Sequence, residues 1–135
     1  EEIKRLKARY FRLLDTKRWD EWGDLFTEDL VATYEGPHPE IRYEGRADIV
    51  ARMRDVLADA VTVHHGHMPE IELTSANTAT GTWAMFDYVQ IPGFTFRGYG
   101  HYEEEYVKEG GKWRIKRLRL TRIRVDVEAK PATAP

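Results

Sequence analysis

The sequence of 135 residues predicts a single domain of the α+β class, and two observations carry that prediction. Up to about residue 60, apolar residues recur at the three- and four-residue spacing of amphipathic helices. Beyond residue 60, long segments rich in β-branched and aromatic residues are separated by short turn segments. A run of helices followed by a run of neighbouring strands is typical of an α+β domain with an antiparallel sheet.

The first helix is predicted over residues 2–17. Ile3, Leu6 and Tyr10 share one face there, and Lys and Arg side chains occupy the other face. A helix with this pattern packs its apolar face on a core and exposes its basic face to solvent.

Four further elements are expected before residue 60. A short helix at 19–25 is followed by a turn at residues 27–29 and a strand at 30–35. After a loop that contains two prolines, residues 41–45 have the pattern of a short edge strand. A third helix is predicted from residue 47 to 58.

Four long strands make up the second half of the predicted fold. Their turns contain Ser-Ala-Asn, Pro-Gly and Glu-Gly-Gly-Lys, which are typical hairpin sequences. The predicted strands are residues 61–74, 78–91, 94–108 and 112–127. The domain is therefore expected to span residues 1–127, and the Pro- and Ala-rich tail 128–135 is expected to leave it or to lie on a neighbouring subunit.

Composition excludes several classes of function. The 21 basic residues are offset by 23 acidic ones, for a net charge of -2, so nucleic acid is not an expected partner. The chain has no cysteine, which rules out disulfides, a thiolate nucleophile and cysteine-ligated metal sites. It also lacks a membrane-spanning apolar run and a signal-peptide core, so we expect a soluble, cytoplasmic protein.

Two segments resemble a known family. TVHHGHMPEIELTSANTATGTWAMFDYV (62–89) and GYGHYEEEYVKEGGKWRIKRLRLTRIRVD (98–126) resemble the SnoaL-like branch of the nuclear transport factor 2 superfamily, and the similarity begins at the first helix. The resemblance implies a cystatin-like roll, in which a cone-shaped, curved antiparallel sheet follows three N-terminal helices. Relatives include bile-acid 7α-dehydratase, hexachlorocyclohexane dehydrochlorinase, scytalone dehydratase, ketosteroid isomerase and polyketide cyclases, which work without metal or organic cofactor. Pure binding proteins share the fold, so the fold alone assigns no activity.

The resemblance also implies a set of site residues. Asp15 and His64 match the aspartate and histidine dyad of the dehydratases and the dehydrochlorinase, and Tyr10 and Asp87 match two further residues of the bile-acid dehydratase. His101 lies where scytalone dehydratase has a catalytic-site histidine. Trp83, Met85 and Tyr34 are expected to line the pocket.

One arginine of the last predicted strand is expected in the site as well. Arg119, Arg122 and Arg124 are candidates, and we favour Arg122 because it shares strand parity with the apolar Leu118 and Leu120. A β-bulge in this strand would reverse that choice.

The chemistry of these residue types supports a proton-transfer site. A neutral imidazole held by a carboxylate can take a proton near pH 7 without a cofactor. Each residue also has a structural alternative: Asp15 could be a solvated charge that closes the helix, and His64 a core histidine. Asp87 could be a protonated general acid on the apolar face of Trp83 and Met85, or could point outward and bind an arginine at an interface.

No metal site is predicted. His65 and His67 share a strand face, but His64 lies on the opposite face, so the three imidazoles cannot converge on one ion. The acidic run Glu103–Glu105 and the basic last strand are expected to pair across strands on an exposed or interface surface.

We therefore expect a cofactor-independent lyase of the dehydratase type that acts on a small, hydrophobic, hydroxylated molecule. His64, oriented by Asp15, would remove a proton, and Tyr10 or Asp87 would protonate the departing hydroxyl. The alternatives are an isomerase or cyclase that uses the same proton abstraction, a non-catalytic binding domain, and the small subunit of an aromatic-ring dioxygenase. A homo-oligomer is expected, with a trimer favoured over a dimer.

Overall fold

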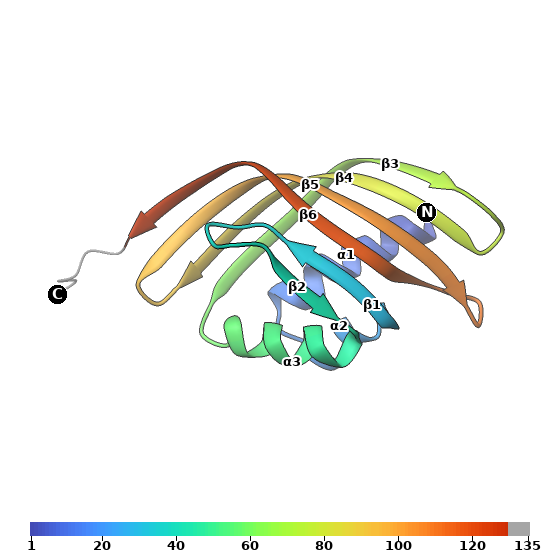
Figure 1. Cartoon of the computed structure of the whole chain (residues 1–135), viewed down its shortest axis with the longest axis horizontal. Helices are drawn as coiled ribbons and strands as arrows, with labels where there is room; N and C mark the ends of the chain where they lie inside the picture. The colour runs from blue at the N-terminus through green and yellow to red at the C-terminus, as the bar shows by residue number, and fades with distance from the viewer. Residues whose placement is uncertain (130–135) are drawn as a thin grey trace.

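A computed structural model describes residues 1–129, which form three helices beneath one curved, unclosed six-stranded sheet (Figure 1). The helices are α1 (Glu2–Asp15), α2 (Trp19–Gly23) and α3 (Arg46–Val56). The strands are β1 (Phe26–Tyr34), β2 (Ile41–Glu44), β3 (Val61–Leu73), β4 (Thr78–Ile91), β5 (Phe94–Glu109) and β6 (Lys112–Ala129). The α+β prediction is confirmed. Of the predicted tail 128–135, the first two residues continue β6 and the other six lie outside the described residues.

The sheet has the order β2-β1-β6-β5-β4-β3, and all neighbours are antiparallel except β1 and β6, which run parallel. The expectation of a wholly antiparallel sheet is therefore wrong for this one pair. Residue alternation predicts that a segment is a strand, but it does not say which strand will lie beside it or in which direction. The short strand β2 lies at one edge, as predicted.

The predicted turn at residues 27–29 is also wrong, because these residues belong to β1. The register to β6 shifts there: Phe26 pairs with Ile115, whereas Val31 pairs with Arg117. Five steps along β1 thus match two steps along β6. The polar residues that favour a turn sit in this bulge, which bends the strand without ending it.

The core lies between the inner face of the sheet and α1. Tyr10 is fully buried at its centre, and the rings of Trp22, Phe26 and Tyr102 lie 5.7, 6.1 and 5.8 Å from its ring centroid. These four residues come from four different elements, α1, α2, β1 and β5, and Tyr102 is far from the other three in the sequence. Their packing holds the C-terminal end of α1 over the sheet, next to β3.

A buried ion pair joins α1 to β5. Lys7 Nζ lies 2.6 Å from a carboxylate oxygen of Glu104, and both side chains are fully buried. The ammonium group also lies 3.7 and 3.5 Å from the ring centroids of Tyr10 and Tyr102. Burial lowers the pKa of Lys7 to about 8, although Glu104 acts in the opposite direction.

This ion pair corrects two sequence expectations. Lys7 was assigned to the solvent face of the first helix, and Glu104 to an exposed acidic run. Strand alternation explains Glu104, because it points inward between Tyr102 and Tyr106, while Glu105 points outward and lies 3.6 Å from Arg117. Cross-strand pairing is thus confirmed for Glu105 and wrong for Glu104.

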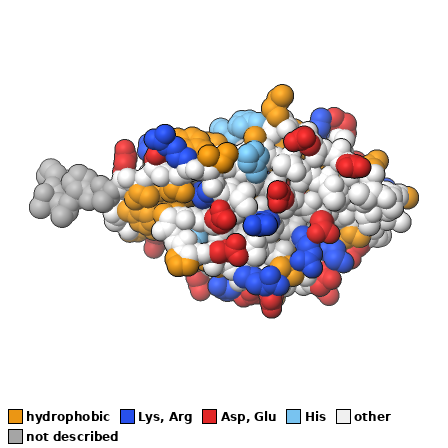
Figure 2. Space-filling view, turned by 45° about the horizontal axis from the view of Figure 1, so that its top comes forward, with side chains coloured by type: hydrophobic (Ala, Val, Ile, Leu, Met, Phe, Trp, Pro, Cys, Tyr) orange, Lys and Arg blue, Asp and Glu red, His pale blue; other side chains and the backbone are white. Residues whose placement is uncertain are grey.

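Side chains of several kinds share the outer face of the sheet. Figure 2 shows histidine and hydrophobic side chains side by side near its upper edge, and mixed acidic and basic side chains over much of the rest. None of the helices within residues 1–129 combines the length and the apolar character that crossing a membrane requires.

Candidate active site

A cavity of about 300 Å³ lies between the inner face of the sheet and helix α3. Its wall is mainly apolar and includes side chains of α1, α3 and all six strands. The polar groups that reach it include Tyr34, His64, Asp87 and Arg122. An apolar cavity with a few convergent polar groups is the usual form of a small-molecule site.

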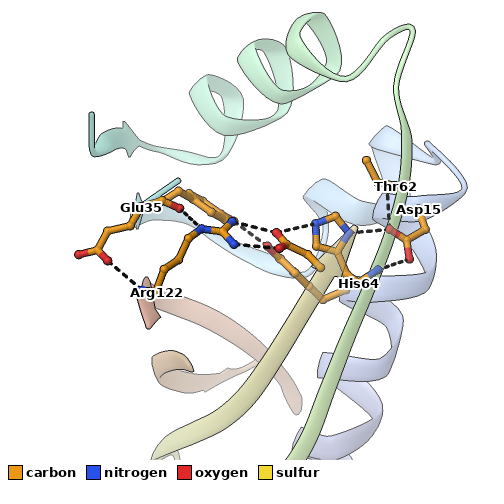
Figure 3. Close-up of polar contacts among 8 residues, drawn as sticks. Asp15, Glu35, Thr62, His64 and Arg122 are labelled. Atoms are coloured by element: carbon orange, nitrogen blue, oxygen red, sulfur yellow. Dashed lines mark hydrogen bonds and ion pairs between the residues drawn. The ribbon is translucent and has the colours of Figure 1, made fainter. Parts of the chain in front are cut away.

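Asp15 and His64 form a hydrogen-bonded dyad at one side of this cavity (Figure 3). Asp15 is the last residue of α1, and its Oδ1 lies 2.6 Å from His64 Nδ1. The carboxylate also accepts the backbone N–H of His64 at 2.9 Å and the hydroxyl of Thr62 at 2.9 Å. Since an ionised carboxylate can only accept, Nδ1 carries the hydrogen, and Nε2 is left with its lone pair.

The free nitrogen of His64 points toward Asp87. Nε2 lies 4.0 Å from Asp87 Oδ2, and the His64 side chain is only 9% exposed. The Asp15 side chain is 21% exposed and faces a second hollow, a groove between α1 and β3. His64 thus separates the groove from the cavity, and its two nitrogens face in different directions.

Asp87 is buried on the inner face of β4, on the side predicted from the parity of Trp83 and Met85. It is not alone there, because both oxygens accept hydrogen bonds of 2.8 Å from the guanidinium of Arg122. The carboxyl group is thus paired with an arginine on the inner face, and its role as a general acid stays a prediction. The structural alternative was right about the arginine partner but wrong about the outward direction.

Arg122 is the arginine that points into the cavity. Its Nε donates to the carbonyl oxygen of Glu35 at 2.5 Å, and its backbone N–H donates to Glu35 Oε1 at 2.8 Å. Arg124 is exposed and binds Asp126 instead. Two register shifts relative to β5 occur in β6, but one falls before Leu118 and the other falls after Arg122, where Ile123 is 78% exposed.

Tyr34 lines the cavity, whereas the predicted site residue Tyr10 does not. Tyr34 lies at the end of β1, and Tyr10 is fully buried in the core. The two hydroxyl oxygens are 2.7 Å apart, so Tyr10 can reach the cavity only through Tyr34. Burial raises the pKa of both tyrosines, and both remain protonated at neutral pH.

Three predicted pocket residues do not reach the cavity. His101 lies on the outer face of β5, because strand alternation directs its neighbours Gly100 and Tyr102 inward. Trp83 faces the groove beside α1 and donates its indole N–H to Tyr106 at 2.9 Å. Met85 is buried on the inner face of β4 but is not part of the cavity wall.

The two other histidines of β3 lie away from the cavity. His65 and His67 are exposed, with ring centroids 5.9 Å apart. Within residues 1–129, no group of three or more histidine or acidic side chains is arranged to hold a metal ion.

Several residues of the site were not found from the sequence. Thr62 shares strand parity with His64, and this signal could have identified it. Glu35 gave no signal, because its role depends on the end of β1 lying beside β6. Gly98 matters because a Cβ at this position would overlap both the Arg122 guanidinium and the Asp87 carboxylate.

Comparison with known proteins identifies the family of the domain. Residues 1–119 match the family model described as SnoaL-like domain. A curated relative named Probable cyclase FGR4, from Gibberella zeae, is 23% identical over 133 residues, which covers 90% of this chain and 89% of that protein.

Solved structures resemble the whole fold. A scytalone dehydratase-like protein from Novosphingobium aromaticivorans is 24% identical with a TM-score of 0.81, over 93% of this chain and 84% of that one. A hexachlorocyclohexane dehydrochlorinase, LinA type 2, is 20% identical with a TM-score of 0.83, over 99% and 91%. At these levels of sequence identity, the structural similarity shows that the fold is shared.

Proposed function

The chain belongs to the SnoaL-like domain family, and on that premise we propose that it is a small-molecule lyase of the dehydratase type. The Asp15–His64 hydrogen bond at the wall of an apolar cavity is the observation that carries the proposal. The family and its structural neighbours include enzymes, among them a dehydratase-like protein and a dehydrochlorinase.

The first step is proton abstraction by His64. Because Asp15 holds Nδ1–H, Nε2 is the basic atom and takes the proton from a carbon of the substrate. The resulting imidazolium lies between two carboxylates, Asp15 on one side and Asp87 on the other. The C-terminal end of α1, which carries a negative partial charge, also lies beside it. These charges stabilise the cation while the reaction proceeds.

The second step is loss of water. The electron pair of the broken C–H bond forms the new double bond, the C–O bond breaks, and the departing hydroxyl takes the proton from His64 Nε2. His64 thereby returns to its neutral form, and no other acid is required. This route replaces the expected acids, since Tyr10 does not reach the cavity and Asp87 is paired with Arg122.

The cavity favours a compact, mainly apolar substrate. Its volume is about 300 Å³, and its aromatic and aliphatic lining suits a hydroxylated alicyclic, steroid-like or aromatic molecule. Such a substrate would bind with its reacting carbons toward His64.

A cyclase or isomerase is the second candidate. The curated relative named Probable cyclase FGR4 favours it, because returning the proton to a different atom would use the same dyad. A non-catalytic binding domain is a further alternative, in which the dyad is only a structural hydrogen bond.

The test is a turnover screen. Wild type, His64→Ala and the matched outer-face control His65→Ala are incubated with hydroxylated steroids, hydroxyacyl thioesters and aromatic alcohols, and loss of water is followed by mass spectrometry. We expect the wild type and His65→Ala to dehydrate at least one compound, and His64→Ala to lose about 100-fold or more of that rate. A folded His64→Ala variant that retains the rate would disprove the assigned base. Binding without any conversion would favour the binding domain.

A further inference from the structure

The hydroxyl group of Tyr102 has no hydrogen-bond partner among the described residues, although the side chain is fully buried. Buried hydroxyl groups are nearly always bonded, since an unmade bond leaves the cost of dehydration uncompensated. Tyr102 lies on β5 and lines the same cavity as His64 and Asp87. The unpaired group is therefore part of the candidate site.

The neighbouring polar groups are already engaged with each other. The hydroxyls of Tyr10 and Tyr34 share one hydrogen bond, and both oxygens of Asp87 accept from Arg122. The Glu104 carboxylate accepts from Lys7 and from Tyr106. Each of these groups makes at least one hydrogen bond in the folded chain, whereas the Tyr102 hydroxyl makes none.

Tyr102 also remains a hydrogen-bond donor at neutral pH. Burial raises its pKa well above the ordinary value for tyrosine, and the nearby Tyr34, Asp87 and Glu104 add to the increase, whereas the neighbouring hydroxyl of Tyr10 acts in the opposite direction. A protonated phenol can donate to a carbonyl or hydroxyl oxygen. The wall of the cavity thus contains a side chain whose O–H group the described residues leave without a hydrogen bond.

We propose that Tyr102 is a ligand-binding residue whose hydroxyl donates a hydrogen bond to an uncharged oxygen of the substrate, either a carbonyl or a hydroxyl. The inference rests on the proposed function only in that the same cavity receives the substrate. It goes beyond that proposal by requiring an oxygen function on the part of the ligand that contacts β5.

The charges of the site explain why this oxygen is uncharged. Arg122, the cation of the cavity wall, already has its charge balanced by Asp87 and also binds Glu35. A carboxylate on the ligand would add a further negative charge near Asp87 without a free cation to balance it. Tyr102 can therefore favour ketones and alcohols over both hydrocarbons and acids.

Four matched probes test this selectivity: 2-tetralone, 2-tetralol, tetralin and tetralin-2-carboxylate. Their dissociation constants are measured by ligand-detected NMR for the wild type, Tyr102→Phe and Tyr99→Phe. Tyr99→Phe is the control, because this substitution also removes a tyrosine hydroxyl from β5, but on the outer face of the sheet. We expect the wild type and Tyr99→Phe to bind the ketone or the alcohol about tenfold more tightly than tetralin or the acid. In Tyr102→Phe the advantage over tetralin should disappear.

Thermal unfolding without ligand gives a second readout. Removing a hydroxyl that has no partner should leave the melting temperature of Tyr102→Phe unchanged or raise it. A lower melting temperature together with unchanged probe selectivity would mean that the hydroxyl is bonded within the protein, and would overturn the proposal. Failure of the wild type to prefer the oxygenated probes, including failure of all four to bind at millimolar concentration, would overturn it as well.

The two proposals can fail separately. If Tyr102 controls probe selectivity but no compound is dehydrated, the binding role stands and the lyase proposal fails. If dehydration occurs and Tyr102→Phe leaves KM for an oxygenated substrate unchanged, the lyase proposal stands and the role of Tyr102 fails.

Discussion

Four side chains form one connected series through the site, Asp15, His64, Asp87 and Arg122, and the backbone carbonyl of Glu35 accepts a further bond from the Arg122 guanidinium. The imidazole is the one member of this series whose charge changes in the proposed reaction. Each of its neighbours is a carboxylate, so the protonated form gains from both. The arginine in turn keeps Asp87 in place and compensates its charge.

Asp15→Asn should reduce turnover by about 100-fold or more while the protein stays folded. An asparagine side chain can present an N–H to His64 Nδ1, which would move the hydrogen to Nε2 and remove the basic lone pair from the cavity. Steady-state kinetics against the best substrate of the screen checks this. Thr62→Val, which removes one bond to Asp15 without changing the tautomer, should have a smaller effect. Equal losses in both variants would contradict the tautomer argument.

Gly98→Ala should lower the free energy of unfolding by about 1–3 kcal/mol, because the added Cβ would overlap the Arg122–Asp87 pair. Urea denaturation measures the effect. The same change made in an Asp87→Ala/Arg122→Ala background should cost less than half as much, since the overlapping groups are then absent. An equal cost in both backgrounds would show that the glycine is needed for another reason.

At the scale of elements, helix α1 connects the dyad to the core. Its last residue, Asp15, orients His64, and two turns earlier Lys7 anchors the helix to β5 through Glu104. The same helix therefore carries one ionic group at the wall of the cavity and one in the dry interior. Movement of α1 relative to the sheet would disturb both contacts.

The Lys7 ion pair predicts a specific pH dependence of stability. The pKa of Lys7 falls from its ordinary 10.5 to about 8 on folding, so between these values the unfolded chain binds more protons. The stabilisation that comes from the lowered pKa of Lys7 is therefore fully present above about pH 10.5, and it is lost as the pH falls to about 8. Relative to a Lys7→Met/Glu104→Gln reference, the wild type should gain stability as the pH rises from 8 to 9.5. Urea denaturation at several pH values checks this, and a flat or falling difference would contradict it.

On the scale of the whole molecule, the two faces of the curved sheet differ in what they carry. Its inner face holds the core and the cavity, and its outer face carries an aromatic patch of His65, Phe86 and Tyr99. The ring centroids of His65 and Tyr99 lie 6.1 and 5.6 Å from that of Phe86. The exposed Ile123 of β6 lies in the strand next to Tyr99.

We propose that the protein forms a homo-oligomer through this outer patch, with a trimer favoured over a dimer. Phe86→Glu should shift the population toward monomer, because it places a charge in the centre of the apolar contact. Thr80→Glu, on the same face of β4 but nearer its other end, is the matched control. Light scattering after size-exclusion chromatography gives the mass, and a wild-type monomer would disprove the prediction.

Local patterns in the sequence were sufficient for most of the elements. Helical spacing identified the three helices, and turn residues separated the four long strands within a residue or two of their ends. Strand parity placed Asp87 on an apolar face and selected Arg122 from three arginines. These signals succeed because burial on one side of a helix or strand follows from the period of that element alone.

Other features were decided only when distant segments came together. The parallel pairing of β1 with β6, the burial of Lys7 against Glu104 and the bond between Asp87 and Arg122 each join residues 35 or more positions apart. His101 is a different case. Its strand was predicted correctly, but the prediction of a role in the pocket did not take into account that the residue lies on the outer face of that strand. The sequence by itself determined the elements and the candidate dyad. The tertiary structure decided which polar groups are paired, which reach the cavity and which, like Tyr102, are left without a partner, because each of these depends on what the opposite wall supplies.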